Sequence, residues 1–450
     1  MTPQTLPTVA ARPAEPPRRG RPASRRGRVG RAFARLALLA AVTVGLLVGG
    51  LSVWRARAFS EHLALARADS LHGRTIAATS HLQLCESIDA DDRGVMLLAA
   101  RVLRMSQRWL PAEEVLERYW ATHGDDEALA FERLLLKAAR DDTAAADAPL
   151  LARVARGGDD ARLARQALVS GYLREFRYAQ SQAALDGWLA EVPGDPLAEL
   201  LLGRYQEHIS KYRDASESYA AVVARDPTHC EARLRLALTL MQQRRAEEAL
   251  DHLGLLRGEL PGNPEVAVQW AVALRQVGRT DEAVAALEQS LAEFPDSASA
   301  LAERATVALN AGDDALAADL FGRALPIDPG AIGARSQYVV ALMRLGRAAD
   351  ADRERDRVKV LTADTDRLTE LIHGPLQADP RDPGPPFEIA GIALRAGQPL
   401  EALRWFHAAL QRDPGHGPTH AALAVTYREM GNPVLATRHR ALAAKAARHP

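Results

Sequence analysis

Apolar and polar side chains follow one another along this chain in a pattern that repeats every 34 residues. Within each period, two amphipathic stretches of about 13 residues flank a short turn, which is the pattern of a helical hairpin. Six such units follow without a break and begin at Arg162, Pro196, Cys230, Pro264, Ala298 and Ile332. A fixed period of this length predicts an all-α architecture of stacked helix pairs.

Three positions of the unit carry the same kind of residue in at least five of the six units. Position 20 is small (Ser181, Ala215, Ala249, Ala283, Ala317, Ala351), position 24 is bulky (Leu185, Tyr219, Leu253, Leu287, Phe321) and position 32 is proline (Pro193, Pro227, Pro261, Pro295, Pro329). A small residue lets two helix backbones cross closely. The bulky residue would fill the space between successive units, and the proline would end the second helix.

These residues resemble the tetratricopeptide repeat (TPR) family, whose 34-residue helix–turn–helix unit has small, aromatic and proline residues at the same places. The match is close in residues 196–229, where Gly203, Tyr212, Ala215, Tyr219 and Pro227 fall in place, and again in residues 298–331. The family's aromatic residue at the fourth position is missing from every unit. The resemblance implies a right-handed α-solenoid with a concave groove that binds peptides or other protein segments.

The proline register slips by half a unit after residues 162–365, which hold the six regular units. Pro380 and Pro414 resume the spacing but are displaced by 17 residues. We therefore expect residues 366–382 to add a helix or to lengthen the previous one, with Gly374-Pro375 bending or ending it. Residues 383–450 would form two final units, and residues 60–161 would form three degenerate ones.

The chain begins with an Arg- and Pro-rich segment, residues 1–35, which holds nine Arg and a single acid, Glu15. The whole chain has 57 basic and 57 acidic residues, so this asymmetry leaves 48 basic and 56 acidic residues to the remainder. The segment has too few large apolar groups to offset its conformational entropy, and we expect it to be disordered. Nucleic-acid binding is one interpretation of its Arg cluster, but the next segment offers a plainer one.

Residues 36–54, LALLAAVTVGLLVGGLSVW, contain no charged side chain. As a helix this run is about 28 Å long, close to the thickness of a bilayer core. Arginines before a span keep that end in the cytoplasm, and a Trp such as Trp54 is favoured at the interface. We therefore expect a single-pass signal-anchor with the repeats outside the cytoplasm, in the periplasm if the protein is bacterial. A cleaved signal peptide is the alternative, because Ala56-Arg57-Ala58 is an A-x-A sequence.

Motifs of catalysis, phosphate binding or metal binding do not occur in this sequence. His416 and His420 are four residues apart, but no acid or cysteine is placed to complete a tetrahedral metal site. Cys85 and Cys230 are the only cysteines, and a long-range disulfide is the alternative to two free thiols. We expect no enzyme activity, no cofactor, no metal and no small-molecule substrate.

The resemblance to TPR proteins implies that the second, fifth, ninth and twelfth positions of each unit face the groove. The candidates for a peptide groove are Leu200, Arg204, Leu234, Leu238, Val268, Val272, Thr306 and Val340. Packing in an ordinary core is the alternative role for the same residues. The Lys and Asn residues of the chaperone-binding carboxylate clamp are missing, so the expected partner is a partly apolar peptide or helix.

The sequence therefore predicts a membrane-tethered TPR scaffold that mediates protein–protein interactions, with the repeats outside the cytoplasm. One alternative is an adaptor that faces the cytoplasm, which requires an inverted anchor. The other is an enzyme that carries TPR repeats, but the units leave no length for a catalytic domain. A nucleic-acid partner is not expected.

Overall fold

The computed structural model of the chain describes residues 50–140, 143–379 and 381–448. It divides into two units, residues 1–61 and 62–450, and the described part of the first unit is the helical stretch 50–61. Within these ranges the regular structure is helical and contains no strand, so the predicted all-α class is confirmed. The predicted disordered tail and residues 36–49 of the predicted span lie outside the described ranges.

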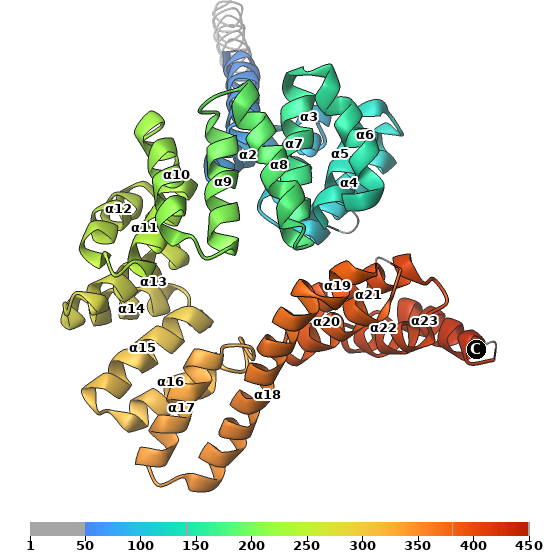
Figure 1. Ribbon diagram of the computed structural model, residues 1–450. Coiled ribbons are helices and arrows are strands. Elements are labelled where there is room, and N and C mark those ends of the chain that lie inside the picture. Colours follow the sequence, from blue (N-terminus) through green and yellow to red (C-terminus); the bar gives the residue numbers. More distant parts are fainter. Residues whose placement is uncertain (1–49, 141–142, 380, 449–450) are drawn as a thin grey trace, which may run out of the picture. The chain divides into compact units, whose positions relative to one another are not determined.

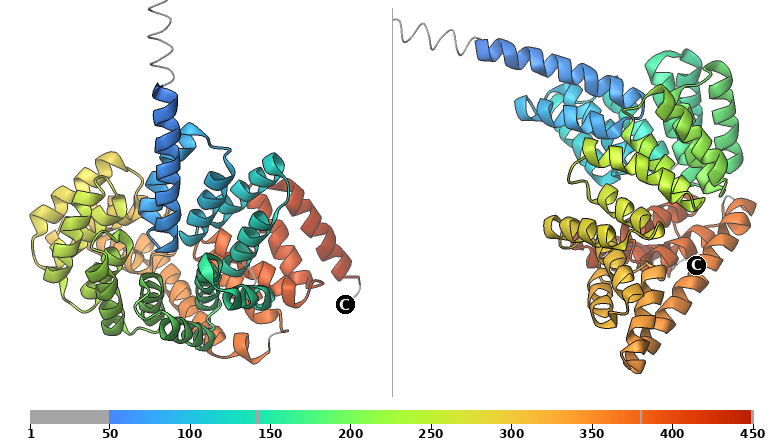
Figure 2. Two further views of the ribbon diagram at one scale, coloured as in Figure 1. Left: turned by 90° about the horizontal axis from the view of Figure 1, so that it is seen from above. Right: turned by 90° about the vertical axis from the view of Figure 1, so that its left-hand side faces the viewer.

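The helices of the second unit form hairpins that follow one another in chain order (Figure 1), and two further views show the same succession (Figure 2). After helical residues 62–71 the helices are α2 (Thr75–Ile88), α3 (Arg93–Met105), α4 (Trp109–His123), α5 (Glu127–Arg140), α6 (Thr143–Arg156), α7 (Gly158–Arg174), α8 (Tyr178–Glu191), α9 (Pro196–His208), α10 (Tyr212–Arg225), α11 (Cys230–Gln242), α12 (Ala246–Glu259), α13 (Pro264–Gln276), α14 (Thr280–Glu293), α15 (Ala298–Ala311), α16 (Asp314–Ala324), α17 (Ile332–Arg344), α18 (Ala348–His373), α19 (Pro375–Ala378), α20 (Gly384–Arg395), α21 (Pro399–Arg412), α22 (Gly417–Glu429) and α23 (Pro433–Ala446).

The small residues of the repeat lie at the crossing of the two helices of a hairpin. The five alanines from Ala215 to Ala351 and Ser181 are all fully buried. The bulky residues four positions later, Leu185, Tyr219, Leu253, Leu287 and Phe321, are also fully buried. At Gly203 even a methyl group would meet the ring of Tyr219, so this pair fills the crossing completely.

The turn inside each hairpin needs one residue with a positive φ angle. Glycine fills this place at Gly278, Gly312 and Gly346, where φ is 82°, 83° and 73°. Earlier hairpins put a residue with a side chain there: Gln107, Phe176, Ser210 and Arg244, with φ between 58° and 62°. A side chain costs roughly 1–2 kcal/mol in this left-handed conformation, so the surrounding helix packing maintains these turns against strain.

A polar side chain caps the following helix at the end of four loops between hairpins, those of Asp195, His229, Asn263 and Ser297. The Asp195 carboxylate accepts a hydrogen bond from the Leu197 N–H at 2.9 Å, and Asn263 accepts one from the Val266 N–H at 3.1 Å. Such a cap satisfies one of the backbone donors that the first helical turn leaves open. The loop prolines lie between these caps and the preceding helix, where they interrupt no helical hydrogen bond.

The 34-residue spacing of the loop prolines is interrupted where the structure has a long helix. Helix α18 has 26 residues, whereas α8, α10, α12 and α14 each have 14. It ends at His373, and Pro375 begins the four-residue α19 after Gly374. The hairpin α20–α21 follows after Asp382.

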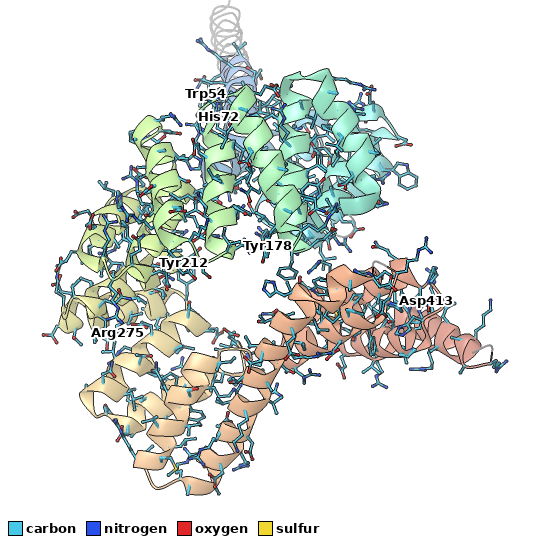
Figure 3. All side chains as sticks on the ribbon, in the orientation of Figure 1. Trp54, His72, Tyr178, Tyr212, Arg275 and Asp413 are labelled. Atoms are coloured by element: carbon cyan, nitrogen blue, oxygen red, sulfur yellow. The ribbon has the colours of Figure 1, made fainter. Side chains whose placement is uncertain are left out.

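The described part of the chain includes no helix with the length and hydropathy that a membrane span requires. The described helical stretch from Gly50 onward exposes Leu51, Val53 and Trp54, and Trp54 is labelled in Figure 3.

Candidate protein-interaction surface

The eight groove candidates differ in how far they are accessible. Leu200 and Val268 are buried in the main core, with 2% and 4% of their surface exposed. Leu234 and Val272 are half-buried against that core, and Arg204, Leu238 and Thr306 are also half-buried. Thr306 donates a hydrogen bond to Gln337 at 2.7 Å, and Val340 is exposed. The candidates therefore divide between the core and the accessible surface, as the two interpretations of the sequence allowed.

The starts of α9 and α11 are covered by the turn before α2. A methyl group on Gly73 would lie 3.0 Å from Leu197 and 3.2 Å from Leu200. Arg74 pairs with Asp226 at 3.2 Å, and Thr75 donates to Glu231 at 3.2 Å. The last two contacts join residues 152 and 156 positions apart, so a segment of the same chain occupies this part of the predicted groove.

The ring of His229 also holds the turn before α2 against the start of α11. Its Nε2–H donates to the His72 carbonyl at 3.2 Å, while Nδ1 accepts from the Ala232 N–H at 3.3 Å. One neutral tautomer satisfies both bonds. Burial lowers the pKa of His229, which keeps that neutral form at physiological pH.

A large cavity in the second unit has a volume of about 1300 Å³. One wall is formed by α3, α4, α5, α7 and α9, and the other by the ends and turns of α20, α21, α22 and α23. Of the eight sequence candidates, Arg204 lines this cavity. The remaining lining includes residues that the repeat pattern did not single out, above all Arg104 and Arg174.

Arg104 is buried in the cavity wall, with 2% of its surface exposed. Its Nη1 donates to the Gln166 side chain, but among the described groups Nε and Nη2 have no hydrogen-bond partner. Burial lowers the pKa of the guanidinium to about 10, so it still carries its charge at neutral pH. The neighbouring carboxylate of Glu132 is bonded instead to Arg101 at 2.8 Å.

Contacts between α7 and α21 form one end of the cavity. Arg174 donates to the Ala139 carbonyl at 3.1 Å, and its guanidinium lies 4.3 Å from the centre of the Trp109 ring. Its Nη1 lies 3.5 Å from Glu401. Burial opposes ionisation of Glu401, but the nearby Arg404 and Arg174 outweigh that effect and lower its pKa.

Aromatic rings extend this contact. The ring of Phe176 stacks on that of Trp405 at 6.2 Å and 9°, and Tyr178, labelled in Figure 3, packs edge-on against Phe176. Phe176 is also the aromatic residue in a left-handed turn. The strained turn after α7 therefore presents the ring that contacts α21.

The histidines of the cavity contribute little positive charge. Burial lowers the pKa of His208 and of His407, and the neighbouring arginines Arg204 and Arg140 lower them further. His407 also lies 3.0 Å from the Tyr427 hydroxyl. At neutral pH the positive charge of the cavity therefore resides on its arginines.

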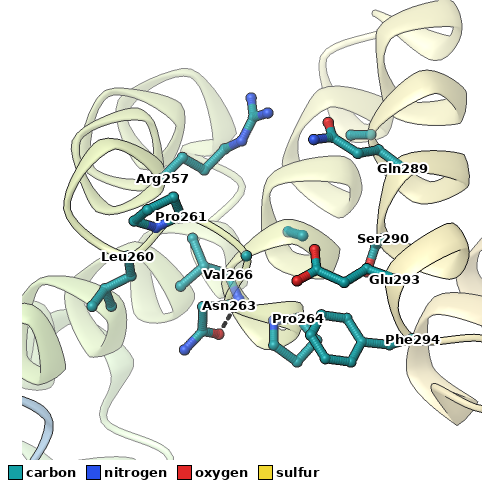
Figure 4. Close-up of a pocket in the computed structure, with 13 residues that line it drawn as sticks. Arg257, Leu260, Pro261, Asn263, Pro264, Val266, Gln289, Ser290, Glu293 and Phe294 are labelled. Carbon is teal, nitrogen blue, oxygen red and sulfur yellow. Dashed lines mark hydrogen bonds between the residues drawn. The ribbon is translucent and has the colours of Figure 1, made fainter. Parts of the chain in front are cut away.

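Two smaller pockets lie elsewhere in the second unit. One of about 150 Å³ follows the loop before α13, between the cap Asn263 and Glu293 (Figure 4). Another of about 670 Å³ lies along α18, α20 and α21, where Phe387 and Phe406 supply apolar surface and Arg367 is bonded to Glu388 at 2.7 Å. Both are smaller than the large cavity, and in each the basic and acidic side chains come in equal numbers, Arg257 against Glu293 in the first and Arg367 and Arg395 against Asp382 and Glu388 in the second.

Among the described residues, no three His, Cys, Asp or Glu side chains come together as metal ligands. His416 lies 2.6 Å from the Thr419 hydroxyl, and His420 lies against His439 and the Pro414 carbonyl. No disulfide joins Cys85, which is buried, to Cys230, which is half-buried, so the alternative of a long-range disulfide is wrong.

The comparisons with known proteins concern the repeats. Residues 210–270 and 268–332 each match a family model described as the tetratricopeptide repeat, which confirms repeats of this kind in that part of the chain. No curated protein matches the chain.

Several solved structures are similar in fold. A thermophilic TPR protein of Thermus thermophilus is 24% identical over 40% of this chain and 97% of its own, with a TM-score of 0.35. PilW, a widely conserved type IV pilus biogenesis factor, is 20% identical over 44% of this chain and 91% of its own (TM-score 0.39). The Cut9–Hcn1 hetero-tetramer of the APC/C is 13% identical over 82% of this chain and 86% of that one (TM-score 0.40).

Proposed function

Because residues 210–332 are tetratricopeptide repeats, we propose that this chain is a membrane-tethered scaffold that binds protein partners outside the cytoplasm. The observation that carries the binding function is the large cavity of the second unit, which is lined by residues within 104–208 and 397–435. Its volume of about 1300 Å³ exceeds the roughly 300–1000 Å³ that is usual for small-molecule sites. A protein segment is the ligand that matches this size and the mixed apolar and charged lining.

The proposed tether rests on the sequence of residues 36–54. These 19 residues are uncharged, and nine arginines precede them within residues 1–35. Since positive residues are retained on the cytoplasmic side, the arginines favour a cytoplasmic N-terminus and an external repeat array.

Site-specific crosslinking tests the binding surface. A photoreactive amino acid in place of Arg204 faces the cavity, and the same amino acid in place of Arg213 lies on the exposed surface of α10. We expect position 204 to crosslink in cells to a discrete protein that mass spectrometry identifies, and position 213 to give none. Equal products at both positions would contradict binding in the cavity.

Thiol labelling tests the topology, but the native cysteines are poor targets. Burial raises the pKa of Cys85, and burial together with Glu259 raises that of Cys230 to about 12. A better reporter is Ala220→Cys, at an exposed position of α10, compared with Ser24→Cys in the N-terminal tail.

A membrane-impermeant maleimide is expected to label Ala220→Cys in intact spheroplasts and Ser24→Cys only after the membrane is permeabilised. The opposite order would support the alternative function, an adaptor that faces the cytoplasm.

A further inference from the structure

We infer that the last described hairpin, α22–α23, is an acid-sensitive wall of the large cavity. Protonation of the His420–His439 pair loosens this hairpin and releases a bound protein segment. The inference rests on the proposed function, since it adds a means of regulation to the same binding surface. It is carried by a direct contact between two buried imidazole rings inside the hairpin.

Hydrogen bonding holds the two rings of this pair in their neutral forms. His420 and His439 have 5% and 8% of their surface exposed, and their Nδ1 atoms lie 3.0 Å apart. Nε2 of His420 lies 3.0 Å from the Pro414 carbonyl oxygen, which can only accept, so this nitrogen carries the proton of the ring. Nδ1 of His420 is then the acceptor, and His439 donates to it through its own Nδ1–H.

The equivalent contact in α17–α18 joins opposite charges instead. Arg335 donates to the Pro329 carbonyl at 3.0 Å, six residues earlier, as His420 does to the proline carbonyl of its own loop. Arg335 also bonds to Glu354, 19 residues later, which is the separation within the histidine pair. The last hairpin therefore has two titratable bases where α17–α18 has an ion pair.

Acid disrupts the histidine pair because added protons meet positive neighbours. One extra proton places a charge in the buried contact, and a second makes both Nδ1 atoms donors that face each other. The groups that oppose a charge on His439 are His420, His407 of α21 and Arg438. Burial, together with these neighbours, lowers the pKa of His439 to about 4.

The acids near this hairpin are engaged elsewhere or exposed. Residues 413–448 hold two acids, Asp413 and Glu429. Asp413 accepts a hydrogen bond from a backbone N–H of its own loop at 2.8 Å, and Glu429 is exposed at the end of α22. On α21, Glu401 is bonded to Arg404 at 3.0 Å. Among the described residues, no carboxylate is hydrogen-bonded to either ring of the pair.

The stability of the hairpin therefore depends on pH in one direction. An unfolded histidine has a pKa of about 6.5, whereas the pKa of His439 in the folded hairpin is lowered to about 4. The stability that the neutral ring contributes is fully present above about pH 6.5 and is lost as the pH falls from there towards about 4.

The hairpin can open without unfolding the other repeats. It packs on α21 and is the last described hairpin, so its opening breaks chiefly its own contacts. Four of its residues line the large cavity, namely Tyr427, Met430, Asn432 and Leu435. The Tyr427 ring also stacks on that of His439 at 5.5 Å and 19°, which joins the cavity lining to the histidine pair. Opening of the hairpin therefore removes part of one wall of the cavity.

Hydrogen–deuterium exchange of the full-length chain in a mild detergent tests the inference. The protection of α22–α23, corrected for intrinsic exchange rates, is compared with that of α13–α14 at about pH 7 and about pH 5. We expect acid to lower the protection of α22–α23 at least about tenfold more than that of α13–α14, because about pH 5 is well below the unfolded pKa of about 6.5.

The decisive variant is His439→Asn. Its amide does not titrate, and it can donate to His420 at neutral pH and accept from it in acid. We expect the acid-induced loss of protection to shrink to less than about threefold. His81→Asn is the matched control, since His81 forms the same Nδ1–Nδ1 contact with His62, at 2.8 Å and with the same separation of 19 residues. This control is expected to leave the acid response of α22–α23 unchanged.

Three results would overturn the inference: equal loss of protection in α22–α23 and α13–α14, an unchanged acid response of His439→Asn, or crosslinking from position 204 that persists in acid while the hairpin opens. Circular dichroism shows whether His439→Asn folds. If it does not, His420→Gln decides the question, because its amide can still donate to the Pro414 carbonyl while one titrating ring is removed. The exchange measurements need no partner, so a chain without a crosslinked partner would refute the scaffold function and leave the acid response standing.

Discussion

Truncation of Phe321 to alanine is expected to destabilise the protein by about 3–5 kcal/mol, the usual cost of removing a buried aromatic ring. Phe321 is fully buried between α15, α16 and α17, and its ring lies 6.2 Å from that of Tyr338. Phe321 belongs to a buried cluster that is rich in alanine, including Ala305 and Ala341, and alanine side chains cannot extend to fill the space that the ring leaves. Chemical denaturation of the purified chain measures the change.

The location of the damage is also predictable. Each hairpin contacts chiefly its neighbours in the chain, so amide exchange should increase first in α15–α17 and less in α9–α12. Phe294→Ala is the control, because that ring is only half-buried beside a surface pocket. If both variants lost the same stability, the packing role given to Phe321 would be wrong.

Replacement of Gly171 by alanine is expected to destabilise the protein by about 2–3 kcal/mol, although alanine is the better helix former. Gly171 lies within α7, and a methyl group there would stand less than 3.0 Å from the Ala138 carbonyl oxygen and the Thr143 hydroxyl. The carbonyl belongs to a helix backbone that cannot move aside cheaply. The steric cost therefore exceeds the gain in helix propensity of about 1 kcal/mol.

Gly187→Ala is the matched control for this substitution. Gly187 lies within α8, and none of the described atoms beyond its own helix and chain neighbours lies within 4 Å of where the methyl group would stand. With no clash, the same change should stabilise the protein by up to about 1 kcal/mol. Thermal unfolding of both variants should give shifts of opposite sign, and shifts of the same sign would contradict the close approach at Gly171.

The regular hairpins could be predicted because their signals are local and repeated. A small residue at each crossing and a bulky residue four positions later fix the packing of neighbours, and the alanines and rings of both series are buried as that argument requires. The turn was harder to predict. Only three of its positions in the regular units carry glycine, whereas Phe176, Ser210 and Arg244 adopt the same left-handed conformation under the constraint of the packed helices.

The departures of α16 and α18 from the regular helix lengths depend on residues outside the repeat pattern. Pro326, three residues ahead of the repeated Pro329, follows the early end of α16, which has 11 residues. For the lengthened α18, the sequence signal is the shift of the proline spacing. This shift left open whether an extra helix or a longer one would result.

The large cavity could not be derived from the repeat because its walls come from distant parts of the sequence. Arg174 and Glu401 are 227 residues apart, and Phe176 meets Trp405 across a similar separation. One local signal did exist. Arg104 is a charged residue among the buried apolar side chains of α3, next to Val102 and Met105, and such a residue suggests a buried polar contact or a site.

The contact of the turn before α2 with α9 and α11 has a mechanical consequence. In a linear stack, a force that pulls on one end peels the hairpins away one at a time, because each holds only its neighbours. Here Arg74 and Thr75 are fastened to Asp226 and Glu231, so tension arriving from the N-terminal side passes directly to α11. The hairpins from α3–α4 to α9–α10 lie in the chain segment between these two contacts. They carry no tension until the bonds of Arg74 and Thr75 to Asp226 and Glu231 break.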